Sequence, residues 1–315
     1  MIEILQGGML TTVQDLGRTG YQRFGMPVAG AMDAFSLRLA NILVGNDPGE
    51  AGLEATVMGP TLRFLSDAVF AVAGGDFGPT LNGTPIEMDR AHLACGGDEL
   101  RLPMARRGAR AYVAFGGGLD LPPVMGSRST CLKAGLGGLH GRALRAGDRI
   151  GLRASGTVPK DWERRAAPPD LPLPLEDRVS VRFTWGYQAD RFTAAGRLAF
   201  CRGQYTLSPQ SDRMGYRLQG PRVETLPGAG SVISDGVCFG SIQITDGCPI
   251  VMMADRQTTG GYPKIGCVIG ADLPLLSQLK AGDGVRFLPV QITTAQRAWR
   301  ARLDALAALQ RSFEP

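Results

Sequence analysis

Histidines and closely spaced cysteines are scarce in this chain of 315 residues. Only His92 and His140 could serve a histidine-based metal centre or a Ser-His-Asp triad, and His140, in a glycine-rich loop, is the better placed of the two. None of the six cysteines belongs to a Cys-x-x-Cys pair. This spacing does not indicate a zinc site, so we expect no metal and a set of free thiols.

Long apolar runs are missing as well. No run approaches the roughly 20 residues that cross a bilayer, and Met1–Ile4 is not a basic region followed by an apolar stretch. The chain also lacks a Gly-x-x-x-x-Gly-Lys-Ser/Thr phosphate loop and a dinucleotide fingerprint placed between a strand and a helix. We therefore expect a cytoplasmic protein with no membrane partner.

Lysine is rare too, so arginine carries nearly all the positive charge. The formal net charge is +5, and the arginines are scattered along the chain. A nucleic-acid-binding protein more often shows a dense basic stripe with aromatic residues between the charges, so nucleic acid is not an expected partner. The scatter is typical of a solvated basic surface, and an anionic substrate or an acidic partner protein is the alternative.

Glycine and proline are abundant, with 44 and 21 residues and no collagen-like period. This composition favours short strands joined by tight turns. In the N-terminal half, 69–73 and 111–115 are short β-type runs, and Asn82-Gly83 is a strong hairpin signal. The pattern predicts an N-terminal β-barrel domain over 1–155, with one helix over 33–44 that begins at an Asp N-cap.

The second half repeats this pattern after a proline-rich segment. Residues 156–178 are predicted to be a linker, because they are rich in proline and lack periodic apolar residues. A second β-barrel domain is expected over 179–292. A C-terminal helix follows over 293–315, where Thr293 and Gln296 have capping-box spacing. Its apolar face favours packing on the second domain, with a partner protein as the alternative.

Two polar, glycine-rich segments are candidate binding loops. Residues 126–130 place hydroxyls and a guanidinium on one short loop, which suits a carboxylate or a phosphate. Residues 211–217 combine an acid, two arginines and a tyrosine. Each segment could instead be a turn held by side-chain to backbone hydrogen bonds, or an internal ion pair between Asp212 and Arg213. The candidate substrate- or anion-binding residues from these segments are Ser127, Arg128, Ser129, Thr130, Arg213 and Tyr216.

The densest cluster of reactive side chains is 255–264, which follows an apolar strand. It places an acid, a guanidinium, an amide and two hydroxyls before two glycines that let the backbone approach a ligand. Asp255 is the predicted general acid or base, with Arg256 and Lys264 as the electrostatic groups. The remaining predicted binding residues are Gln257, Thr258, Thr259, Gly260, Gly261 and Tyr262. An elaborate β-turn is the structural alternative.

Blocks spread over nearly the whole chain resemble a known family. It is the family of the C subunit of 5-oxoprolinase (also called KipA), which includes biotin-dependent carboxyltransferase domains and proteins like allophanate hydrolase subunit 2. The resemblance rests on segments 12–18, 30–33, 40–46, 126–130, 137–142, 211–218, 240–243 and 255–264. Several blocks in the family's order are more specific than any single motif among them.

The resemblance implies a mainly β fold of two cyclophilin-like β-barrels, with a few short helices and the C-terminal helix. It also implies the C subunit of an ATP-dependent 5-oxoprolinase that opens 5-oxoproline to glutamate. Such a chain would act on a small lactam or amide together with the A subunit and a KipI-like B subunit of that enzyme. ATP would be bound by this chain or elsewhere in the complex. The resemblance adds Gln243 to the binding residues, and Asp15, Arg18 and Asp212 as secondary residues of the pocket or contacts between subunits.

Two other functions share this scaffold. One is the carboxyltransferase subunit of a biotin-dependent urea or amide carboxylase, with carboxybiotin as the donor. The other is a KipA-type regulator that binds a kinase-inhibitor protein. Because fold similarity does not choose among functions, the resemblance leaves all three open.

Overall fold

The computed structural model describes residues 1–153, 159 and 161–314. The chain divides into two compact units, and neither is a single continuous segment. Unit 1 consists of Met1–Arg18, Ala29–Leu175 and Asp304–Pro315, and unit 2 of Thr19–Val28 and Glu176–Leu303. The sequence predicted domains made of continuous segments, and two segments depart from that prediction. Thr19–Val28 belongs to unit 2, and the end of the C-terminal helix, from Asp304, belongs to unit 1.

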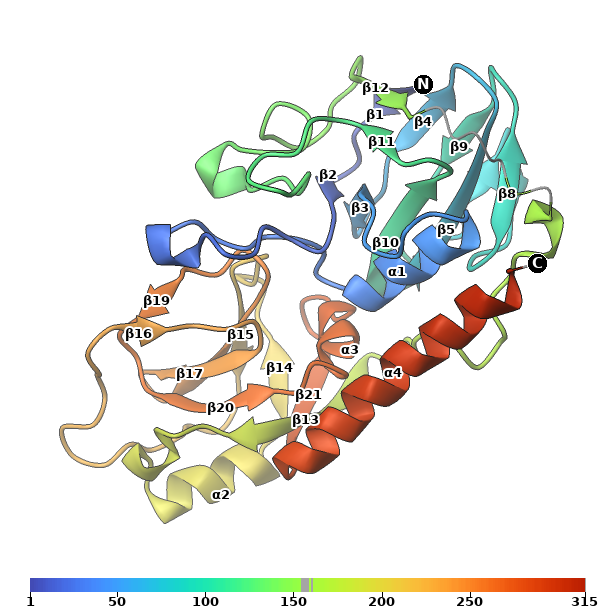
Figure 1. Ribbon diagram of the computed structural model, residues 1–315. Coiled ribbons are helices and arrows are strands. Elements are labelled where there is room, and N and C mark those ends of the chain that lie inside the picture. The colour runs from blue at the N-terminus through green and yellow to red at the C-terminus, as the bar shows by residue number, and fades with distance from the viewer. Residues whose placement is uncertain (154–158, 160, 315) are drawn as a thin grey trace. The chain divides into compact units, whose positions relative to one another are not determined.

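Unit 1 is built mainly from short antiparallel strands in two sheets (Figure 1). The first sheet has the order β11-β12-β1-β4-β9-β6-β7 and the second the order β2-β3-β10-β5-β8. Its elements are β1 (Ile2–Gln6), β2 (Leu10–Gln14), α1 (Ala34–Leu43), β3 (Gly52–Thr56), β4 (Thr61–Phe64), β5 (Ala68–Asp76), β6 (Thr80–Leu81), β7 (Thr84–Pro85), β8 (Ala91–Ala94), β9 (Glu99–Arg101), β10 (Arg107–Phe115), β11 (Leu119–Asp120), the 3-10 helix η2 (Leu132–Ala134), β12 (Arg149–Leu152) and the 3-10 helix η3 (Trp162–Arg164).

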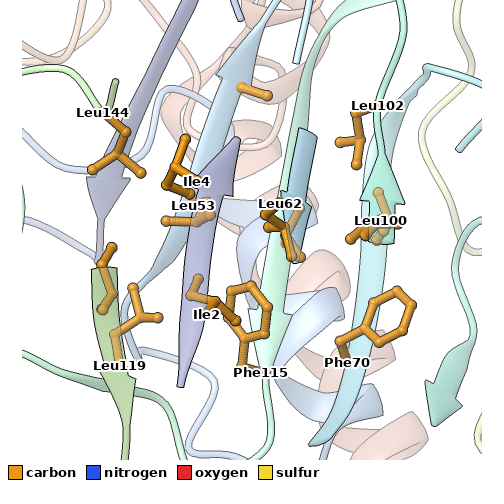
Figure 2. Packing of buried hydrophobic residues seen from close by; sticks show 14 of the residues in the cluster. Ile2, Ile4, Leu53, Leu62, Phe70, Leu100, Leu102, Phe115, Leu119 and Leu144 are labelled. Carbon is orange, nitrogen blue, oxygen red and sulfur yellow. The ribbon is translucent and has the colours of Figure 1, made fainter. Parts of the chain in front are cut away.

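One hydrophobic core serves both sheets of unit 1. Ile2 and Ile4 of β1 meet Leu53 of β3, Phe70 of β5 and Phe115 of β10, and all five are fully buried (Figure 2). Alternate residues of a strand point to the same face, so each strand contributes every second side chain to this layer. Burial of each such side chain stabilises the fold by about 1.5–3 kcal/mol.

The helix cap and the hairpin turn predicted for unit 1 are both present in the structure. Asp33 caps α1, and its Oδ1 accepts a hydrogen bond from the backbone N–H of Ser36 at 2.9 Å. Asn82 and Gly83 both have positive φ, 52° and 80°, between the two strands of a hairpin. A two-residue turn with this geometry matches the twist of the flanking strands.

Unit 2 contains a closed barrel (Figure 1). Its strand order is β13-β20-β17-β18-β15-β14-β21, and β13 closes the ring by pairing in parallel with β21. The elements are the 3-10 helix η1 (Gln22–Phe24), β13 (Arg178–Trp185), the 3-10 helix η4 (Ala189–Arg191), α2 (Ala194–Arg202), β14 (Tyr205–Leu207), β15 (Gly215–Gln219), β16 (Asp235–Gly236), β17 (Ser241–Thr245), β18 (Cys248–Met252), β19 (Thr259–Gly260), β20 (Lys264–Val268), α3 (Leu273–Ser277) and β21 (Gly284–Pro289); α4 (Ile292–Ser312) contributes its first part.

Aromatic side chains form the barrel core. Phe183, Phe200 and Phe287 are fully buried, with the rings of Phe200 and Phe287 stacked at 4.6 Å between centroids. Phe183 meets Phe200 edge-on at 5.1 Å. Such aromatic pairs add about 0.5–1.5 kcal/mol beyond the area they bury. These aromatic residues pack inside the barrel whose strands carry the candidate site.

The mainly β fold with a C-terminal helix is confirmed, and three details differ from expectation. Within the described part of unit 1 the strands form two sheets instead of a closed barrel, with the two-residue strands β7 and β11 at the edges of the first sheet. The C-terminal helix begins at Ile292, so Thr293 lies inside it and the capping-box prediction is wrong. In the proline-rich segment, Ala167 N–H bonds Asp89 O at 2.8 Å, so this part docks on unit 1; residues 154–158 and 160 lie outside the described residues.

Candidate active site

The barrel unit contains a pocket of about 560 Å³. It is bounded by the turn after β13, the segment between β16 and β17, and strands β19 and β20. Its lining residues are Gln22, Gly186, Tyr187, Gly236, Val237, Cys238, Ser241, Arg256, Thr258, Thr259, Lys264, Gly266 and Cys267. Four of the residues predicted from 255–264 therefore line one cavity. A hollow of about 830 Å³ in unit 1 is lined by none of the predicted site residues.

Among the described residues that line this pocket, Lys264 is a cation whose charged group has no hydrogen bond within the described structure. It is the first residue of β20, and its backbone N–H donates to Oε1 of Gln188 at 2.7 Å, which holds the strand end in place. The residue is 6% exposed, and Nζ lies 3.6 Å from Oδ2 of Asp235. Nζ makes no hydrogen bond to any described residue. Burying an ammonium without hydrogen bonds is costly, and an anionic ligand would supply the missing acceptors.

Arg256 is the second cation of the pocket, and unlike Lys264 its charged group donates hydrogen bonds to backbone carbonyls. Its Nε donates to the carbonyl of Val237 at 3.1 Å and its Nη1 to that of Met253 at 3.3 Å. Burial lowers the pKa of Arg256, while the thiols of Cys238 and Cys267 oppose that shift. A guanidinium remains protonated in proteins, so its charge persists. Backbone carbonyls thus fix one positive charge in the pocket wall, and the ammonium of Lys264 provides a second.

Asp255, the predicted acid or base, is not among the pocket-lining residues. Its Oδ2 accepts from Nε of Arg213 at 3.0 Å and its Oδ1 from Nη2 at 2.9 Å. Both side chains are buried. Asp212 has a different partner, because its Oδ1 accepts from the backbone N–H of Met214 at 2.8 Å, which makes a local turn. The Asp255–Arg213 pair joins the turn before β15 to the start of the reactive segment.

The rest of 257–262 forms a small ladder beside the barrel. β19 pairs with β16, Asp235 opposite Gly260 (Figure 1). A Cβ on Gly260 would lie 2.5 Å from Nε2 of Gln243, so glycine permits this close approach. Nε2 of Gln243 in turn donates to the carbonyl of Tyr262 at 3.4 Å. Tyr262 is exposed, whereas Gln257 is half-buried. Neither residue lines the pocket.

The predicted binding loop 126–130 belongs to unit 1, where it surrounds Asp15. The Asp15 carboxylate accepts from Oγ of Ser127 at 2.7 Å and from the backbone N–H of Arg128 at 2.6 Å. Arg18 is fully buried and donates from Nη2 to the carbonyl of Ser129 at 2.7 Å. Thr130 is also buried, and its backbone N–H bonds Val13 O. These contacts hold the loop around Asp15 within unit 1.

The structure thus brings together only part of the predicted set. Arg256, Thr258, Thr259 and Lys264 line one pocket. Tyr216 is buried in the barrel wall, with its hydroxyl 3.4 Å from the carbonyl of Ser277. Sequence reasoning missed Cys238, Ser241 and Cys267, because single cysteines and serines carry no motif and their proximity depends on strand register. Within the described residues, no cluster of His, Cys, Asp or Glu could hold a metal ion, and no helix is long and apolar enough to cross a bilayer.

The protein has a mainly β fold and a pocket lined by two cations of segment 255–264. Comparison with known families identifies the class of protein to which it belongs. Residues 24–289 match the family model described as "Carboxyltransferase domain, subdomain A and B". Because this match covers most of the chain, the protein belongs to that family.

Its relatives include proteins of two named kinds. The C subunit of 5-oxoprolinase from Escherichia coli (strain K12) is 38% identical over all of this chain and 97% of its own length. That of Haemophilus influenzae is also 38% identical, over 95% of this chain and 94% of its own. The solved urea amidolyase of K. lactis matches with a TM-score of 0.92 and 32% identity, over 98% of this chain and 20% of that much longer one.

Proposed function

We propose that this chain is the C subunit of an ATP-dependent 5-oxoprolinase, which opens the lactam of 5-oxoproline to give glutamate. Two bacterial relatives carry the name of that subunit, and each aligns with this chain over almost its full length. The urea amidolyases contain the same region as less than a quarter of a larger protein. This chain therefore covers nearly the whole of the named 5-oxoprolinase subunits but only a small part of the urea amidolyases.

The buried ammonium of Lys264 carries the proposal. The substrate has a carboxylate, and ring opening develops negative charge on the lactam oxygen. Lys264 Nζ, with no hydrogen bond to the described residues, would donate to one of these oxygens, and Arg256 would add a fixed positive charge. Thr258 and Thr259 offer hydroxyls on the same wall. Asp255 would act as a positioning residue, since Arg213 already occupies both its oxygens.

We further propose that ATP is bound in the complex that this chain forms with the A and B subunits, because this chain lacks the common phosphate loop. Bound ATP would supply the phosphoryl group that activates the lactam oxygen. The two cations of the pocket fit the negative charge of such a species. The contribution of this chain is therefore to bind and orient the substrate anion.

The test is ATP hydrolysis that depends on 5-oxoproline. The chain is purified with the products of neighbouring genes, and turnover is measured for wild type and Lys264→Ala. Removal of one donor to a developing oxyanion lowers kcat by about 100- to 1000-fold. Lys280→Ala is the matched control, because Lys280 pairs with Asp177 and Asp283 and does not line this pocket. No turnover in any combination of these gene products, or normal turnover in Lys264→Ala with the complex assembled, contradicts the proposal.

A second candidate is the carboxyltransferase subunit of a biotin-dependent urea or amide carboxylase. The name of the matching family model and the urea amidolyase relatives favour it. Carboxyl transfer from carboxybiotin also needs an anion site, so Lys264 would serve in both reactions. The two functions differ in the requirement for biotin. Turnover that needs a biotin carboxylase and a biotinylated carrier supports this candidate, and turnover without them supports the hydrolase.

A further inference from the structure

A cysteine from a loop and a cysteine from a strand meet in the wall of the pocket. Cys238 lies just before β17 and Cys267 lies on β20, and their Sγ atoms are 3.6 Å apart. Ser241 sits directly opposite Cys267 in the β17–β20 ladder. Its Oγ is 3.0 Å from Sγ of Cys238 and also accepts the backbone N–H of Cys238 at 3.1 Å. Strand register and a tight turn together hold the two sulfurs face to face.

The surroundings make the two thiols unequal. The hydrogen bond from Cys267, then that from Ser241 and the charge of Arg256, lower the pKa of the Cys238 thiol. The hydrogen bond to Cys238, then burial, raises the pKa of the Cys267 thiol. Cys238 is exposed and Cys267 is half-buried. An accessible thiolate beside a protonated thiol is the arrangement of an attacking cysteine with its resolving partner.

We propose that Cys238 and Cys267 are a redox pair that a peroxide converts to a disulfide. The Cys238 thiolate attacks one oxygen of hydrogen peroxide, the O–O bond breaks, and hydroxide leaves with a proton as water. The sulfur of Cys267 then displaces the hydroxyl of the Cys238 sulfenic acid as a second water. Two thiols and one peroxide thus give one disulfide and two waters, and a dithiol reverses the reaction.

The bond would join two walls of the pocket. Formation requires the sulfurs to move from 3.6 Å to about 2.05 Å. One wall is formed by Gly236, Val237 and Cys238. This segment begins in β16, which pairs with β19. The other is β20, which carries Lys264. Oxidation would therefore restrain both sides of the cation site, and it offers a way to control access of an anion. The chemistry of the pair does not rest on the proposed function.

Peptide mapping of the full-length chain tests the pair directly. Trypsin releases Cys267 alone in 265–280, but it leaves both Cys238 and Cys248 in 223–256. The experiment therefore uses a Cys248→Ser background, in which only one thiol of the larger peptide remains. After treatment with hydrogen peroxide and without reductant, we expect the two peptides to be linked, with a mass lower by two hydrogen atoms. Dithiothreitol should separate them.

Two variants in that background separate the steps. In Cys267→Ala the reaction should stop at a Cys238 sulfenic acid, which dimedone traps; in Cys238→Ala, Cys267 should not react. Exposed Cys95 is the internal control and should react more slowly than Cys238. Circular dichroism checks that each variant is folded. The proposal is overturned if no intramolecular link forms, if the link joins two molecules, or if Cys95 reacts as fast as Cys238.

Discussion

Asp255 and Arg213 form a buried ion pair with two hydrogen bonds, 3.0 Å and 2.9 Å long, between residues 42 positions apart. The pair connects the reactive segment to the turn before β15. Both oxygens of the carboxylate are engaged, so we propose that Asp255 holds the backbone that presents Arg256 to the pocket.

Asp255→Asn should destabilise the protein strongly. The change removes the carboxylate from a guanidinium whose side chain is 5% exposed. Breaking a buried pair in this way costs about 3–5 kcal/mol. Glu99→Gln is the control, because Glu99 and Arg63 form a surface pair with both side chains more than 40% exposed, worth about 0–1 kcal/mol. Urea unfolding gives both values, and equal small losses would contradict the assignment.

Lys264→Met should lower turnover without lowering the free energy of unfolding. The ammonium is buried without a hydrogen bond to the described residues, and its partner Asp235 is half exposed. Replacing such a charge with an apolar side chain of similar length should leave the free energy of unfolding unchanged or raise it by about 1 kcal/mol. Turnover should fall by about 100- to 1000-fold, as in Lys264→Ala. A marked loss of stability in thermal or urea unfolding would show that Nζ contributes to the fold.

Asp89 should make unit 1 less stable as the pH rises. Burial, aided by the charge of Asp33, raises the pKa of Asp89 to about 7, against the backbone hydrogen bond from Gly74. In the unfolded chain the pKa is about 3.9, so the contribution to stability is complete below pH 4 and is lost as the pH rises to 7. The slope is at most about 1.4 kcal/mol per pH unit.

Asp89→Asn provides the test, because an amide does not titrate. Asparagine also tolerates the positive φ of 56° at this position. From pH 5 to pH 7 the unfolding free energy of wild type should fall relative to that of Asp89→Asn, so the gap between the two proteins changes steadily with pH. Parallel curves would show that the Asp89 carboxyl is already ionised at pH 5.

Alkylation of Cys238 should begin at unusually low pH. The hydrogen bonds from Cys267 and Ser241 and the charge of Arg256 favour its thiolate, and Lys264 also lines the pocket. The rate with iodoacetamide should therefore reach half its maximum well below the usual thiol value of about 8.5. Cys267→Ala removes the largest of these influences and should move the midpoint upward. A midpoint that is the same in both proteins would show that the sulfur–sulfur contact is not formed in solution.

Features that depend on neighbouring residues were predictable from the sequence. The hairpin at Asn82 and Gly83 and the helix after Asp33 rest on backbone preferences and on caps formed within four residues. The C-terminal helix follows from its apolar periodicity, but it begins at Ile292 and the capping-box spacing of Thr293 and Gln296 does not mark its start. The cluster 255–264 was recognisable because its reactive side chains are adjacent in the chain.

Tertiary structure alone decided which of those side chains act together. Asp212 and Arg213 are neighbours in the sequence, but in the fold they have different partners. Asp212 accepts a hydrogen bond from the backbone N–H of Met214, and Arg213 pairs with Asp255. The sequence shows six cysteines with no Cys-x-x-Cys pair. The β17–β20 register and the turn before β17 bring Cys238 to Cys267. Local preferences act over a few bonds, whereas these contacts depend on barrel closure and strand register, which the whole hydrophobic core sets.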